Sequence, residues 1–107
     1  MAYQGAAEVH RWRAEWKLTQ QRSVSDEVRE GRKHIRDALS RNPGLADALV
    51  TDAALLVIQA EAEPRGRTES LQQARVRLTE AQELNPLINR KTEPISRRLD
   101  TLSQDSR

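Results

Sequence analysis

A short phrase that occurs twice constrains the fold of this chain more than any other feature. Ala38-Leu-Ser-Arg-Asn-Pro43 returns 43 positions later as Ala81-Gln-Glu-Leu-Asn-Pro86. An aliphatic residue, Leu45 or Ile88, follows each proline after one intervening residue. Because a proline pushes the residue before it out of the helical region, each phrase predicts the end of one helix and the beginning of another. A turn that repeats at this spacing indicates stacked helix pairs, the architecture of a helical solenoid.

The composition limits both the core and the compartment. A chain of 107 residues is one domain by length, and its core must be aliphatic because it has no Phe, one Tyr and two Trp. No window approaches the roughly 18 apolar residues of a membrane-spanning helix, and the first residues lack the pattern of a signal peptide. The chain has no cysteine, which excludes disulfides and thiolate metal sites and favours a cytoplasmic protein.

Charged residues are frequent but mixed in sign. The net charge is +2, and acids alternate with bases along stretches such as 26–33. This pattern is typical of a solvated helix face with many salt bridges. Nucleic-acid binding would need a basic stripe, and the nearest candidates are Arg29, Arg32, Lys33 and Arg36. Acidic residues dilute that stripe, so weak nucleic-acid binding through this Arg-rich helix is kept as an alternative.

Apolar residues at helical spacing predict five helices and no strands, so the expected fold is all-α. The first helix is expected from about Tyr3 to Gln21. The second begins at Ser25, a good N-cap, and runs to about Arg41. The third, from about Leu45 to Ala62, is apolar nearly all round, which predicts a place in the middle of a bundle.

Each of the last two expected helices has its apolar residues on one stripe. Thr68 is expected to cap the fourth helix, which ends near Leu84. Pro94 lacks the amide that a continuous helix needs, so we expect a kink or restart near Thr92. The tail after Ser103 is expected to fray. The apolar stripe of the last helix consists of Ile95, Leu99 and Leu102.

These helices resemble the tetratricopeptide (TPR) repeat, a family in which each repeat is a pair of antiparallel helices. The pattern of its first helix is matched by Tyr3-x-x-Ala6-Ala7-x-x-His10 and by Leu49-x-x-Asp52-Ala53-x-x-Leu56. The pattern of its second helix is matched by Gly31-x-x-x-Ile35-x-x-Ala38-x-x-x-x-Pro43 and by Ala74-x-x-x-Leu78-x-x-Ala81-x-x-x-x-Pro86. The chain departs from the family at Asp52, where an apolar residue is preferred, and at His10, which replaces an aromatic residue.

The resemblance implies a short TPR-like solenoid over residues 1–103, with helix pairs at 3–41 and 45–84 and a terminal half-repeat at 87–103. Residues 104–107 would be a frayed tail. It also implies binding of a protein or peptide, because the first helix of each pair lines a concave surface. The residues expected on that surface are Gln4, Glu8, Arg11, Trp12, Glu15, Asp47, Val50, Ala54, Val57 and Ile58. An apolar floor with charged flanks suits a bound peptide or helix. The alternative is that Val50, Val57 and Ile58 only pack against a neighbouring helix.

A second resemblance concerns context. The Arg- and Ala-rich style of the chain, with Leu84-Asn-Pro-Leu87 near its end, is similar to repeat segments behind bacterial serine/threonine protein kinases. It implies a scaffold within a larger bacterial signalling protein, although the chain itself contains no kinase motif. A structural spacer or a self-association domain is the alternative.

No recognisable motif for catalysis, metal binding or cofactor binding occurs. The two histidines, His10 and His34, have no third ligand at metal spacing, and zinc sites normally need three or four. Ser40 follows His34 on one helix, but no nucleophile elbow accompanies them. The glycines are isolated, which excludes a phosphate-binding loop. We therefore expect no enzymatic activity, no metal and no cofactor.

The first helix carries both tryptophans of the chain. Val9, Trp12 and Trp16 lie at i, i+3 and i+7, and packing in the core is the expectation for Trp16. A short array of repeats needs caps at both ends, and no polar helix precedes this one. We therefore expect the first helix either to self-associate or to dock on a preceding domain.

Overall fold

The computed structural model describes residues 3–105, and their side chains from 6 to 104. These residues form five α-helices and no strand, which confirms the all-α fold. The helices are α1 (Tyr3–Thr19), α2 (Ser25–Arg41), α3 (Ala46–Ala62), α4 (Arg67–Leu84) and α5 (Asn89–Asp105), with a short 3-10 turn, η1 (Pro86–Ile88), before α5. None of them is both long and apolar enough to cross a membrane.

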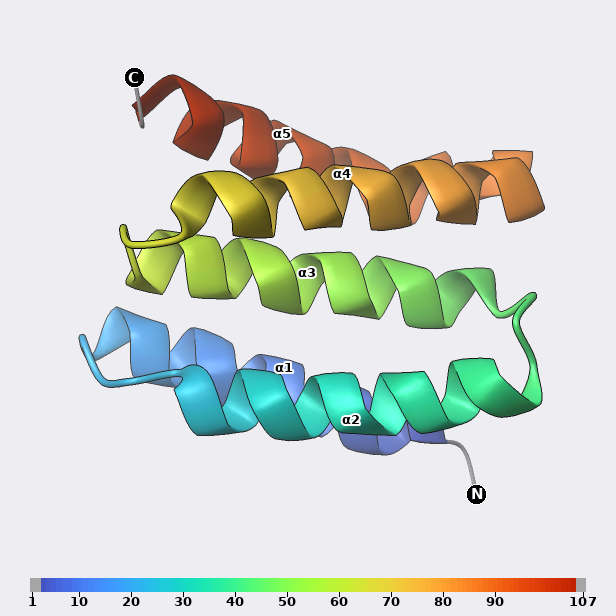
Figure 1. Cartoon of the computed structure of the whole chain (residues 1–107), viewed down its shortest axis with the longest axis horizontal. Coiled ribbons are helices and arrows are strands. Elements are labelled where there is room, and N and C mark those ends of the chain that lie inside the picture. The colour runs from blue at the N-terminus through green and yellow to red at the C-terminus, as the bar shows by residue number, and fades with distance from the viewer. Residues whose placement is uncertain (1–2, 106–107) are drawn as a thin grey trace.

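Consecutive helices run antiparallel, and α3 lies in the middle (Figure 1). The first two helices lie on one side of α3, and α4 and α5 lie on the other. α3 contacts each of the other four helices. Its composition accounts for this position, because every residue from Ala48 to Ile58 is buried and a helix without a polar face must be covered on all sides.

The repeated phrase folds into the same turn twice. Asn42 and Asn85 both leave the helix in extended conformation, with φ and ψ of −146° and 91° in one and −145° and 92° in the other. Each asparagine amide donates to the carbonyl of the alanine four residues earlier, at 2.9 Å. Each side-chain Oδ1 accepts a hydrogen bond at 3.1 Å from the amide two residues on. The predicted helix ends at these two phrases are confirmed.

The second helix begins at Ser25 as expected, but the capping roles expected for Ser25 and Thr68 are wrong. Ser25 is the first residue of α2 and makes no capping bond; its hydroxyl instead donates to Glu63 at 2.8 Å. The fully buried Val24 precedes it, so burial of this side chain, not capping, fixes the start. α4 begins before Thr68, at Arg67, directly after Gly66 with φ of +77°. The Arg67 guanidinium donates to the carbonyl of Ala60 at 2.7 Å and thereby closes the end of α3.

The expected restart near Thr92 is also wrong, because α5 is one helix that contains Pro94. The proline lies early in the helix and is exposed, so a single backbone hydrogen bond is lost on the solvent side. The stripe of Ile95, Leu99 and Leu102 is buried as predicted. The helix continues to Asp105, two residues beyond Ser103, after which the frayed tail was expected to begin.

Candidate binding groove

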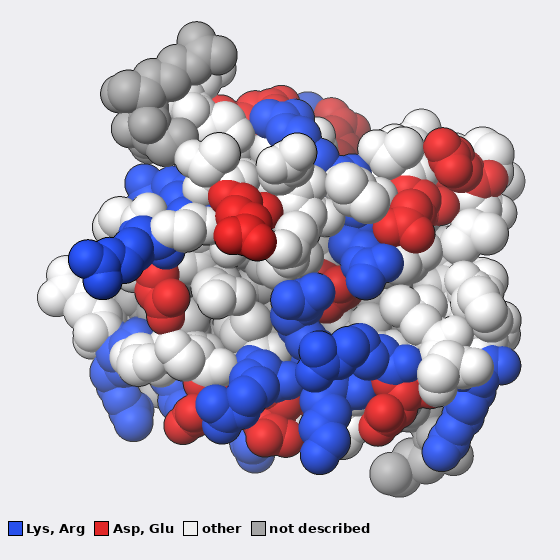
Figure 2. Space-filling model, viewed as in Figure 1, with Lys and Arg blue, Asp and Glu red and all other residues white. Residues whose placement is uncertain are grey.

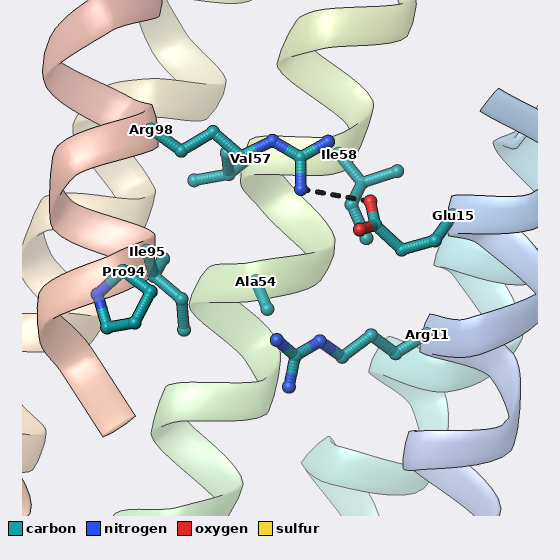
Figure 3. Close-up of a pocket in the computed structure, with 8 residues that line it drawn as sticks. All are labelled: Arg11, Glu15, Ala54, Val57, Ile58, Pro94, Ile95 and Arg98. Atoms are coloured by element: carbon teal, nitrogen blue, oxygen red, sulfur yellow. Dashed lines mark hydrogen bonds and ion pairs between the residues drawn. The ribbon is translucent and has the colours of Figure 1, made fainter. Parts of the chain in front are cut away.

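A hollow of about 240 Å³ lies across α1, α3 and α5, the three odd-numbered helices (Figure 3). Its lining consists of Arg11, Glu15, Ala54, Val57, Ile58, Pro94, Ile95 and Arg98. We call this hollow the groove. α3 supplies an apolar floor, and the flanking helices supply charged side chains on one wall and apolar and charged ones on the other.

Arg98 spans the groove from α5. Its Nη1 donates to Glu15 of α1 at 2.9 Å, and its Nε donates to Glu61 of α3 at 3.0 Å. Burial alone would lower the pKa of Arg98, but the hydrogen bond to Glu61 and the charge of Glu15 raise that pKa above its ordinary value. The guanidinium therefore stays charged and ties three helices together at one end of the groove.

Arg11 extends into the same hollow from α1 (Figure 3). Its Nη1 lies 3.5 Å from Oε1 of Glu8, at the outer limit of a hydrogen bond. Glu8 also accepts a hydrogen bond from Thr51 of α3 at 2.9 Å, which holds its carboxylate against the floor. The guanidinium of Arg11 is thus positioned at the groove with most of its donors available.

Five of the ten residues predicted for the concave surface line the groove. Those five are Arg11, Glu15, Ala54, Val57 and Ile58. Of the others, Glu8 bonds to Thr51, and Val50 is buried in the core. Asp47 accepts a hydrogen bond from Lys91 at 2.8 Å. The side chain of Gln4 lies outside the described residues, and Trp12 is exposed and does not line the groove.

The contribution of α5 was missed in the sequence. Pro94, Ile95 and Arg98 complete the groove, but only the first and third helices were considered for the concave surface. The helical spacing of Ile95 and Arg98 could have indicated that they line the groove, since the first helix of a further pair was expected there.

Both tryptophans are exposed, Trp12 by 67% and Trp16 by 62%. The expectation that Trp16 packs in the core is wrong. The inner face of α1 is instead made by Ala7 and Ala14, both fully buried. Small residues let α1 approach α2 and α3 closely, and the indoles are left on the opposite side of the helix.

A different cluster lies where α2 and α4 meet α3. The carboxylate of Asp52, 2% exposed, accepts hydrogen bonds from Arg32 at 2.8 Å and from Arg77 at 3.0 Å. Basic side chains gather over α2 on the face shown in Figure 2, with acidic ones among them. A shallow hollow of about 210 Å³ on α2 and α3 is lined by Ser25, Val28, Arg29, Arg32, Arg36 and Gln59.

The two histidines meet between α1 and α2. Their rings stack with centroids 5.5 Å apart, and Nδ1 of His10 lies 2.7 Å from Oε2 of Glu27. Lys17 donates to the other oxygen of Glu27 at 3.1 Å. Burial alone would raise the pKa of Glu27, but hydrogen bonds from His10 and Lys17 lower that pKa below its usual value. Among the described side chains, no three His, Cys, Asp or Glu residues are grouped to hold a metal ion.

Comparison with known proteins adds no relative to this picture. The chain matches no protein family, no curated protein sequence and no solved structure.

Proposed function

We propose that this chain is a non-catalytic helical module that binds a protein or peptide in the groove. The supporting observation is the composition of the groove, an apolar floor from α3 between charged side chains of α1 and α5. Apolar contact supplies affinity for an amphipathic segment, and charged walls orient it. The backbone is already in place, because Arg98 holds the three helices together.

The proposal extends to the class of module. Two identical Asn-Pro turns, each closing an antiparallel pair, support a TPR-like stack in which α1, α3 and α5 are the first helices of successive pairs. Modules of this kind are scaffolds within larger proteins, and we propose that this one serves a bacterial signalling protein. A spacer between domains would need the same stack but no ligand.

Weak nucleic-acid binding is the second candidate, supported by one observation. Arg29, Arg32 and Arg36 share one hollow between α2 and α3, and Arg29 is paired there with Asp26 at 3.0 Å and with Glu30 at 4.0 Å. Arg32 is partly neutralised by Asp52. Fluorescence anisotropy with labelled single- and double-stranded oligonucleotides tests this candidate, and binding that weakens in Arg36→Glu and with salt would support it.

The groove is tested with a displayed library of random peptides, followed by titration of selected peptides. Ala54→Arg places a long side chain on the floor, and Arg11→Glu reverses the charge of the wall. Both are expected to weaken binding at least about tenfold, as loss of a central contact does. The matched control is Arg75→Glu on α4, where an exposed charge that does not line the groove should contribute little. Equal effects of all three substitutions would place the binding surface elsewhere.

A further inference from the structure

The outer face of α1 carries an apolar ridge that no described part of the chain covers. Val9, Trp12 and Trp16 are 39%, 67% and 62% exposed. They follow one another at i, i+3 and i+7, so they lie in line on one side of the helix. Tryptophans on an uncovered line are the usual centre of a protein interface, because each indole brings a large apolar area with little loss of entropy.

Two residues beside this ridge, Glu8 and Arg13, have the charge order of a parallel coiled coil. If Val9 and Trp16 take position a of the heptad and Trp12 takes position d, then Glu8 and Glu15 fall at g. Arg13 and Gln20 fall at e, on the opposite edge of the ridge. In a parallel pair of helices each g residue faces the e residue five positions further on in the partner. Glu8 of one chain would therefore face Arg13 of the other.

We propose that the ridge is a self-association surface that pairs α1 with α1 of a second copy of this chain, parallel and in register. Trp12 and Trp16 of each copy pack along the two-fold axis, and Glu8 pairs with Arg13 of the second copy. Oε1 of Glu8 accepts from Thr51 and Arg11, and the intermolecular pair would use its second oxygen. Arg13 is exposed and makes no ion pair within residues 6–104.

The surface area that this pairing would bury indicates a weak dimer. Covered tryptophans bury about 150–250 Å² each, so four partly exposed indoles contribute on the order of 500 Å². Val9 and the charged flanks of both copies bring the total near about 1,000 Å², the lower end of specific interfaces. We therefore expect a dissociation constant in the micromolar range.

Sedimentation equilibrium of the whole chain tests the proposal. The expected result is a mass approaching twice the 12.2 kDa of the monomer at about 100 μM, falling at about 1 μM. The double variant Trp12→Glu/Trp16→Glu should remain monomeric while its circular dichroism stays helical, since both side chains are exposed. Leu87→Glu is the control, because Leu87 is 90% exposed but lies away from α1. A monomer at about 500 μM, or a dimer that survives the double substitution, would overturn the proposal.

The orientation is tested by disulfide trapping, which the chain permits because it has no cysteine. Thr19 falls at the next d position, so Thr19→Cys should form a disulfide between two copies under mild oxidation. Thr79→Cys, exposed on α4, controls for random collision. A dimer in which Cys at position 19 cross-links no faster than the control contradicts the parallel register.

The charge pairing has its own test. Arg13→Glu places two carboxylates opposite each other and should weaken the dimer about two- to fivefold, the effect of an exposed pair. Mixing this variant with Glu8→Arg should restore association as a heterodimer. Absence of preferential heterodimers would contradict the register. None of the Trp substitutions alters a residue of the groove, so the dimer and the proposed peptide binding can fail independently.

Discussion

The carboxylate of Asp52 lies 2.8 Å from Nε of Arg32 in the middle of the most apolar helix of the chain. Arg77 binds its other oxygen from the opposite neighbour, at 3.0 Å. One buried acid therefore fastens α2 and α4 to α3. Both arginines keep part of their side chains in contact with solvent, which reduces the cost of placing the charges there.

Asp52→Ala should destabilise the protein by about 2–3 kcal/mol, because it leaves two partly buried guanidinium groups without their shared acceptor. The control is Asp100→Ala, which removes an exposed partner of Arg75 and should cost no more than about 1 kcal/mol. Urea unfolding followed by circular dichroism measures both. Equal midpoints for the two variants would show that the Asp52 pairs do not stabilise the fold.

Gly31 is predicted to be intolerant of any side chain. A Cβ at this position would lie 2.8 Å from Cδ1 of Leu55, which is fully buried, and 3.2 Å from Cβ of His10. Crowding of this kind costs about 1–3 kcal/mol, which outweighs the gain of about 1 kcal/mol expected for alanine in a helix. Gly31→Ala should therefore lower the free energy of unfolding, and Gly31→Val should lower it further. Gly44→Ala meets only Oδ1 of Asn42 at 3.5 Å and should be nearly neutral.

Glu27 predicts a loss of stability in acid. Because the pKa of Glu27 is lowered in the folded chain, the folded state binds fewer protons than the unfolded one. Its stabilisation is complete above the usual pKa of a glutamate and is lost as the pH falls through the lowered pKa of Glu27.

Glu27→Gln should be less stable than the parent protein at pH 7 and should lose less on acidification. Urea midpoints at several pH values between about 7 and 3 measure the difference. Glu83→Gln is the matched control, because Glu83 is exposed and makes no ion pair among the described side chains. If the two variants show the same pH dependence, the contact with His10 and Lys17 does not stabilise the carboxylate.

The fold could be predicted where the pattern is local. The two Asn-Pro dipeptides predicted the ends of α2 and α4, and the apolar surface of α3 predicted its position in the middle of the bundle. The capping residues at the helix starts were harder to predict, because Ser25 and Thr68 are of residue types that favour capping. In the structure, burial of Val24 and the turn at Gly66 determine where α2 and α4 begin. Capping is worth about 1 kcal/mol, which is less than the burial of an aliphatic side chain.

Part of the groove lining could also be predicted, because it follows from spacing along single helices. Counting along the first and third helices found Arg11, Glu15, Ala54, Val57 and Ile58. Spacing alone could not show that an alanine face turns both indoles outward. Nor could it show the link between Glu15 and Arg98, since 83 positions separate them.

The last prediction concerns that link. Arg98→Met keeps most of the apolar stem but removes the hydrogen bonds to Glu15 and Glu61. α5 should stay folded, because Leu99 and Leu102 remain buried on α3 and α4. Its amide protons should nevertheless exchange about fivefold faster, as two partly exposed pairs together contribute about 1 kcal/mol. Arg97→Met is the control, since Arg97 is exposed and, among the described side chains, forms its one ion pair with Glu93 of its own helix. Hydrogen exchange read by mass spectrometry should show the change in α5 and none in α2. Equal exchange in the two variants would mean that packing alone holds α5, and that Arg98 does not brace the groove.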